Sequence, residues 1–265
     1  MISLLSIRVA TWNVHGFVGT DGRRDPRRTL AVLQELDADV IALQEVDCDG
    51  LDSLAAMAAL HHEVLLGPAC PDRNGFGNAI ISRFPCDQQR VRNLTVEGFE
   101  PRNVVDVQLR VDSGLFPAGA GHGRLRVLAT HFGLDRRERR AQAERLAEIV
   151  DDDSDAGGPS DLTVVLGDLN AFDRGESSVA PLLTRFAPAL KVRSFPAFLP
   201  VMRLDRVLVS HPAVVSVATH RSRLSRTTSD HLPVVGTAVW NSSRTRSIPE
   251  RVENAVANRL QHHDL

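Results

Sequence analysis

The stretch Leu162-Thr163-Val164-Val165-Leu166-Gly167-Asp168-Leu169-Asn170 is the most informative part of the chain. Its opening residues are apolar or β-branched, in a run too short for an amphipathic helix and typical of a strand buried in a core. Gly167 ends that run, and a carboxylate, Asp168, and a carboxamide, Asn170, follow. The sequence therefore predicts a core strand whose end carries polar side chains.

The same arrangement recurs along the chain. Val9-Ala10-Thr11-Trp12 precedes Asn13, Val40 to Gln44 precedes Glu45, Arg126 to Thr130 precedes His131, and Asp230-His231 stands before the run from Leu232 to Val239. A single Asp-Leu-Asn after a strand is more often a turn, because Asp and Asn hydrogen-bond their own backbone. Repetition of oxygen and imidazole groups at strand ends instead favours one shared rim where these groups meet.

Taken in order, residues 11–16, 43–47, 167–170 and 229–234 resemble the endonuclease/exonuclease/phosphatase superfamily. Relatives in that superfamily include deoxyribonucleases, abasic-site endonucleases, sphingomyelinases and inositol polyphosphate phosphatases. The resemblance implies a four-layered α/β sandwich, in which two mixed β-sheets pack together with helices outside. Alternation of strands and helices by itself would also allow a parallel-sheet α/β fold.

The candidate site residues come from both ends of the chain, so we predict a single catalytic domain over residues 1–240. Residues 241–265 are expected to form a polar extension with a surface helix, because apolar residues recur there at helical spacing. Further helices are expected from Pro26, over residues 51–61, and from an Asp135 N-cap to about Val150.

Metal binding is expected at Glu45, with Asn13 and Asp230 beside it. The resemblance implies this role, because Glu45 stands where the family has its principal metal-binding glutamate. Hard oxygen ligands of this kind suit Mg²⁺, and Mn²⁺ is an expected substitute. The alternative for Glu45 is a surface acid that caps a turn.

A catalytic unit is expected from Asp168, Asn170, Asp205 and His231. By resemblance, Asp168 takes the proton of the attacking water and Asn170 orients that water or a phosphoryl oxygen. His231 contacts the scissile phosphate, and Asp205 orients its imidazole. An Asp-held imidazole keeps one tautomer and favours its charged form, which suits a phosphate contact or a proton donor. A surface turn at Asp205 is the alternative.

Three further residues are candidates for contact with the substrate. His131 matches a second catalytic histidine of deoxyribonucleases and sphingomyelinases. Asn78 and Arg102 are candidate substrate-binding residues, and each is equally compatible with a structural role. Abasic-site endonucleases place a tyrosine in this part of the site, and the absence of tyrosine here argues against close kinship with them.

The formal net charge of −2 argues against tight, non-specific DNA binding through phosphate neutralisation. A local basic patch can still steer a phosphodiester. Residues 23–28 and 136–140 are arginine-rich and either flank such a cleft or form solvated faces.

The cellular location is predicted from cysteine usage and hydropathy. Cys48, Cys70 and Cys86 lack metal-site or disulfide-framework spacing, which indicates a reducing compartment. No stretch approaches the roughly 20 apolar residues of a membrane span, and the first residues do not read as a signal peptide. We therefore expect a soluble, cytoplasmic protein with no stable membrane anchor and no obligate protein partner.

The expected activity is Mg²⁺-dependent phosphodiester hydrolysis, most simply that of a nuclease. The alternative substrate is a phospholipid or sphingomyelin headgroup, since both classes of enzyme share these motifs. Residues 194–202 form an apolar loop beside Asp205 that suits a membrane contact, base stacking or core packing. A non-catalytic binding module is a third possibility. Competent residues at every metal and Asp–His position argue against it.

Overall fold

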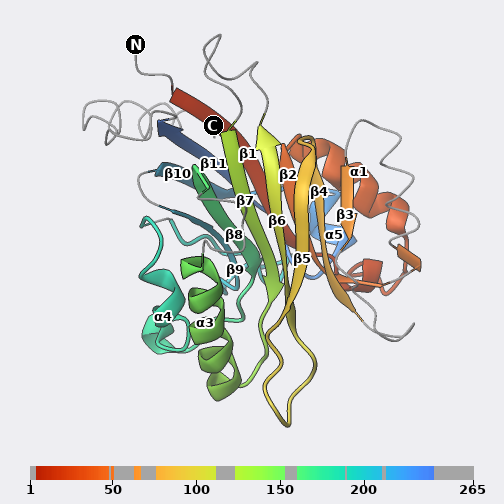
Figure 1. Ribbon diagram of the computed structural model, residues 1–265. Coiled ribbons are helices and arrows are strands. Elements are labelled where there is room, and N and C mark those ends of the chain that lie inside the picture. Colours follow the sequence, from red (N-terminus) through yellow and green to blue (C-terminus); the bar gives the residue numbers. More distant parts are fainter. Residues whose placement is uncertain are drawn as a thin grey trace.

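The computed structural model describes residues 4–47, 49–50, 63–66, 76–111, 123–152, 160–188, 190–210 and 213–241. Two β-sheets pack face to face at the centre, and helices cover the outer faces (Figure 1). Both sheets contain parallel and antiparallel pairs. This arrangement is the four-layered α/β sandwich that the motifs predicted.

The first sheet has six strands in the order β10-β11-β1-β2-β4-β3. Their bounds are β1 Leu4–Asn13, β2 Val40–Val46, β3 Glu63–Leu66, β4 Gly77–Ser82, β10 Ala213–Thr219 and β11 Val234–Asn241. β1 runs parallel to β2 and antiparallel to β11. The ends of β1 and β2 and the start of β11 therefore share one edge.

The second sheet has five strands in the order β5-β6-β7-β8-β9. Their bounds are β5 Cys86–Asn93, β6 Asn103–Val111, β7 Gly123–His131, β8 Leu162–Asp168 and β9 Asp205–Val209. β7 and β8 are parallel, with His131 level with Asp168, and β9 is antiparallel to β8, with Asp205 level with Asp168. The register alone brings three candidate residues to the same end of this sheet.

The core lies between the sheets and is built from short aliphatic side chains. Ile7 and Val9 of β1 and Val40 of β2 pack there against residues such as Val127 of β7 and Val164 of β8. All five are at most 1 % exposed. Burial of these β-branched residues on a pleated surface is what their strand propensity reflects, and it fixes both sheets as one rigid support for the loops at their ends.

The helices begin where the sequence provides N-caps. The Asp25 side chain accepts from the backbone N–H of Arg27 at the start of α1 (Pro26–Leu36), and Asp135 accepts from the N–H groups of Arg137 and Glu138 at the start of α3 (Arg136–Asp151). Both predicted helices are confirmed. The shorter helices are α4 (Ala180–Leu183) and α5 (Ser225–Thr228).

Some predictions fall outside the described residues. The helix expected over residues 51–61 lies there, as does the extension after residue 241, so the domain boundary at residue 240 stays a prediction. Among the described helices, none has the length and apolar character needed to cross a membrane.

Gly167 is required by close packing of β8 against β7. A Cβ at this position would lie 2.3 Å from the carbonyl oxygen of Thr130, closer than any real Cβ contact. Any other residue would push the strands apart where His131 and Asp168 stand side by side. The glycine of the deciding motif therefore sets the spacing of the two polar groups that follow these strands.

The candidate site residues share one end of the sandwich, which we call the site end. It holds the last residues of β1, β2, β7 and β8 and the first residues of β4, β6, β9 and β11. The loops that join these strands therefore surround the candidate site. This topology explains how residues more than two hundred positions apart, such as Trp12 and His231, come into contact.

Candidate active site

Asp168 lies at the centre of the candidate site. Its Oδ2 accepts from the amide of Asn13 at 3.2 Å and lies 3.7 Å from Nε2 of both His131 and His231. Its Oδ1 accepts from the backbone N–H of Asn170 at 2.9 Å. Strand ends from both sheets thus contribute to one buried cluster.

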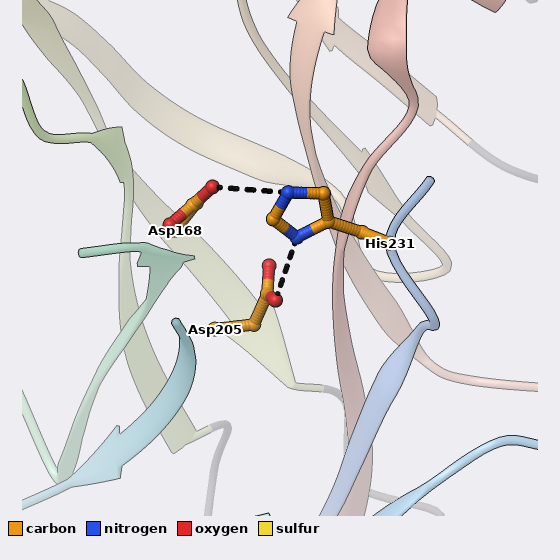
Figure 2. Close-up of side chains that lie close together, drawn as sticks. All are labelled: Asp168, Asp205 and His231. Atoms are coloured by element: carbon orange, nitrogen blue, oxygen red, sulfur yellow. Dashed lines mark hydrogen bonds and ion pairs between the residues drawn. The ribbon is translucent and has the colours of Figure 1, made fainter. Parts of the chain in front are cut away.

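His231 stands between two carboxylates (Figure 2). Its Nδ1–H donates to Asp205 Oδ2 at 2.9 Å, and Nε2 faces Asp168. The Ser194 hydroxyl also donates to Asp205, and the Phe195 ring packs on the imidazole with centroids 4.8 Å apart. The loop 194–202, left open between core and surface roles, therefore fixes His231 through its first residues.

His231 is charged at neutral pH. Burial lowers the pKa of its imidazole, but the Asp205 carboxylate, with help from Asp168, outweighs burial and raises that pKa to about 10. Burial raises the pKa of Asp205 itself, and the ion pair with His231 opposes that rise. The short N–O contact and the high pKa of His231 place the proton on the imidazole.

Asp168 remains an anion. Burial by itself raises the pKa of its carboxyl, but the two histidines, the Asn170 N–H and the Asn13 amide outweigh burial and hold the pKa below its ordinary value. An anionic oxygen beside a charged imidazole is the arrangement that can accept a proton on one side while a proton is donated on the other.

His131 has an N–H group next to each ring nitrogen, and because an imidazole has at most one lone pair it can accept from only one of them. Arg102 Nη1 lies 3.2 Å from its Nδ1, and the Asn170 amide lies 3.2 Å from its Nε2 and donates to the Phe132 carbonyl at 2.8 Å. Burial is the main cause that lowers the pKa of His131; Arg102 adds to the lowering, and the Asp168 carboxylate opposes it. Arg102 therefore reaches the site through His131.

Glu45 and Asn170 occupy the left-handed backbone region, with φ of 55° and 47°. The pairing of β2 with β4 is irregular between Leu43 and Val46, so the bulge turns the Glu45 carboxylate toward Asn13, whose amide donates to it at 2.8 Å. Such conformations cost on the order of 1–3 kcal/mol and cluster at functional sites. The strained backbone at these two positions therefore serves to orient the side chains of Glu45 and Asn170 into the site.

The residues around Glu45 fit a hard divalent cation. Within the described residues, one carboxylate oxygen of Glu45 and one of Asp230 accept no hydrogen bond. Open carboxylate oxygens next to amide groups are the ligands that Mg²⁺ prefers. Asp168, Asp205 and His231 also lie within ligand distance of one another. That triad suits a proton better than a metal, because a charged imidazole has no lone pair to give.

Asn78 lies apart from this cluster in its contacts. Its amide donates to the backbone and side-chain oxygens of Asn103 at 3.2 and 3.1 Å, which joins β4 to β6. Its own carbonyl oxygen is buried with no partner in the described part of the chain. The contacts seen for Asn78 are therefore structural, and its substrate role stays a prediction.

Two contacts of the site were missed by sequence reasoning. Ser194 bonds Asp205 from a loop, and the Trp12 indole N–H donates to the His231 carbonyl at 2.9 Å. Nothing in the sequence around Ser194 marks it, because its role depends on how a loop folds back. Trp12 directly precedes Asn13 in the motif of residues 11–16, and this position was the one feature of the sequence that could have indicated a contact with the site.

The two arginine-rich segments are largely paired with acids. In the first, Arg24 pairs with Asp47 and Arg28 with Asp21. In the second, Arg139 is buried against Asp173, and Arg140 pairs with Glu144. A continuous basic lining for a polymer groove, one of the two roles considered for these segments, has little support from these contacts.

The fold and the cluster define a hydrolytic phosphoesterase class, and the chain belongs to the endonuclease/exonuclease/phosphatase family. The model of that family matches residues 10–231. The match spans every candidate residue from Asn13 to His231.

Known proteins resemble the chain over most of its length. The uncharacterized protein YbhP of Escherichia coli (strain K12) is 28% identical over 251 residues, which cover 86% of this chain and 94% of YbhP. A family protein of Bacteroides thetaiotaomicron superposes with a TM-score of 0.72 at 18% identity, over 91% of this chain and 97% of that one. The mannosyl-6-phosphatase Bt3783 of the same species gives 0.70 at 18% identity, over 88% and 100%.

Proposed function

We propose that this protein is a metal-dependent phosphodiester hydrolase that uses Mg²⁺, with Mn²⁺ as a substitute. The observation that supports this best is the array Asp205–His231–Asp168, in which a charged imidazole lies 3.7 Å from an anionic carboxylate. Family membership supports phosphoester hydrolysis in general. A non-catalytic role is disfavoured, because every position of the array is chemically competent.

In this mechanism Asp168 is the general base and His231 the acid. A water oxygen bonds to phosphorus while its proton passes to Asp168, and the bond between phosphorus and the leaving oxygen breaks. His231 stabilises the phosphoryl charge and gives its Nε2 proton to the leaving oxygen. Asp205 keeps the imidazole charged and oriented. Asn170 and His131 orient the water and a phosphoryl oxygen.

Glu45, Asn13 and Asp230 would hold the metal. A divalent cation held there would neutralise charge that develops on the phosphoryl oxygens and would make a water easier to deprotonate. The protein contributes a fixed Glu45 carboxylate, oriented by the Asn13 amide. Arg102 supports His131 and adds positive charge beside the phosphate. Nucleic acids and phospholipid headgroups both carry a phosphodiester, and the array accepts either.

A Glu45→Gln variant is expected to need at least about tenfold more Mg²⁺ for half-maximal hydrolysis of a soluble aryl phosphodiester. The neutral amide keeps the shape of the side chain but removes the main anionic ligand. Glu144→Gln is the matched control, because Glu144 is an exposed acid of α3 that pairs with Arg140 on the same helix. An unshifted Mg²⁺ midpoint in Glu45→Gln would remove Glu45 from the metal site.

The pH profile should reveal the charge on His231. Since its pKa is raised to about 10, the acid form persists through neutral pH and turnover should fall only as the pH approaches 10. In Asp205→Asn the ion pair is gone, so this pKa should fall toward the ordinary value of about 6.5. The alkaline loss of kcat should then begin near neutrality. Superimposable alkaline limbs in the two proteins would refute this assignment.

A further inference from the structure

Exposed apolar side chains gather at the site end. Among the described residues, all exposed large apolar side chains except Val91 and Leu190 lie in loops at that end. Five of them form what we call the apolar rim: Leu134, Phe172, Phe198, Leu199 and Val201. Phe198 is 71% exposed and Leu134 is 68% exposed. Single exposed apolar residues are ordinary, but a gathering around a site marks an interaction surface.

The rim residues adjoin one another in pairs and lie close to the catalytic array. Phe172 and Val201 line one cavity of about 440 Å³. Phe172 is two residues after Asn170, and Phe198 and Leu199 follow Phe195, whose ring packs on His231. Any partner surface that contacts the apolar rim therefore also lies next to the opening of the candidate active site.

The buried guanidinium of Arg139 contacts two of the rim residues, Leu134 and Phe172. Arg139, 1% exposed, donates to the Leu134 carbonyl, to Ser178 and to Asp173, and lies 4.3 Å from the centre of the Phe172 ring. A buried charge is costly unless it is paired and hydrogen-bonded, as this one is. The outward position of these apolar side chains is thus fixed by an ordered network beneath them.

The free charge beside the rim is positive. Arg174 and Arg203 are exposed and, among the described residues, form no ion pair. Two neighbouring acids are neutralised, because Asp173 pairs with Arg139 and Glu176 with Arg206 and Lys191. The exposed Asp135 beside Leu134 caps α3 and stands next to the exposed Arg136 and Arg137. Exposed apolar side chains beside these two arginines, Arg174 and Arg203, complement a surface that is apolar inside and anionic outside.

We propose that the apolar rim docks on an anionic phospholipid bilayer and that the phosphodiester is that of a phospholipid headgroup. This inference rests on the proposed function for the chemistry. Single-stranded nucleic acid is the other surface that combines apolar and anionic groups, and it binds by stacking bases on aromatic rings. Leu134, Leu199 and Val201 offer no ring to stack on, whereas burial in a lipid interface rewards aliphatic and aromatic side chains alike.

The test is co-sedimentation with phosphatidylcholine vesicles prepared with and without phosphatidylglycerol. Wild type should bind the phosphatidylglycerol vesicles, and Phe198→Ser/Leu199→Ser should bind them roughly tenfold or more weakly, since two large apolar contacts are lost. Val91→Ser removes an exposed apolar side chain on the edge strand β5, three strands away from β8, and should bind like wild type. Arg174→Gln/Arg203→Gln should lower the preference for phosphatidylglycerol.

Hydrolysis assays distinguish the docking inference from the proposed hydrolytic function. Phe198→Ser/Leu199→Ser should cleave a soluble aryl phosphodiester at the wild-type rate while losing hydrolysis of vesicle phospholipid. Wild type that cleaves the soluble diester but ignores both vesicles would overturn the docking inference and leave the proposed function intact. Vesicle binding without hydrolysis of any diester would support the docking surface and reject the proposed function. An oligonucleotide bound through Phe198, without vesicle binding, would overturn the inference in favour of nucleic acid.

Discussion

An Asp168→Asn variant is expected to hydrolyse a soluble phosphodiester about 10²–10⁴ times more slowly than wild type, the usual cost of losing a general base. The substituted amide keeps the shape of the side chain, but its single oxygen can take the place of only one of the two acceptors that serve Asn13 and Asn170, and it cannot take a proton from water. The measurement is kcat at saturating Mg²⁺, with the fold checked by circular dichroism.

Asp151→Asn is the matched control for this variant, because Asp151 is an exposed aspartate at the end of α3 that pairs with Arg185. It should keep full activity. A folded Asp168→Asn protein with turnover near that of wild type would show that Asp168 does not act as the base.

The second large effect is expected at His231. Replacing His231 by Ala should cost about 10²–10⁴ in kcat, because the group that stabilises the phosphoryl charge and protonates the leaving oxygen is lost. Asp205→Ala should also slow the reaction, since the imidazole loses its hydrogen-bond partner and its charge. The Asp205→Ala/His231→Ala double variant should be little slower than His231→Ala, because residues that act as a unit are non-additive.

If the loss of kcat in the double variant equals the product of the two single losses, Asp205 and His231 act independently. That result, with all three proteins folded, would mean that Asp205 contributes to turnover by a route other than His231. Ser210 directly follows β9 at the end opposite Asp205, so Ser210→Ala is the control and should keep wild-type turnover.

The buried strands were predictable from sequence, whereas three of the four edge strands, β3, β5 and β10, were not. β1, β2 and β8 each contain an apolar run because both faces of the strand are covered. β5 has polar residues and alternates half-buried and exposed positions at the edge of its sheet, so no apolar run reveals it. β3 and β10 are also edge strands and were likewise not predicted. The sandwich itself came from the ordered motifs.

The candidate site was predictable to the extent that its residues stand at strand ends. Asp168, Asp205 and His231 were singled out, and the structure brings them together. The contacts of Ser194 with Asp205 and of Arg102 with His131 depend on loops that fold back over the site, which local sequence does not encode. The ion pairs of the arginine-rich segments were not predictable for a similar reason, because partners such as Asp47 and Asp173 lie more than twenty residues away in sequence.

Metal-dependent hydrolysis by the Asp168 array is the central claim, and one titration tests it most directly. Chelator-treated wild type would be assayed on a soluble aryl phosphodiester as Mg²⁺ is added back, with Asp168→Asn in parallel. The account predicts no turnover without metal, a saturable return of activity in wild type, and at most about one hundredth of that activity in the variant. Undiminished hydrolysis in excess chelator, or equal recovery in both proteins, would contradict it.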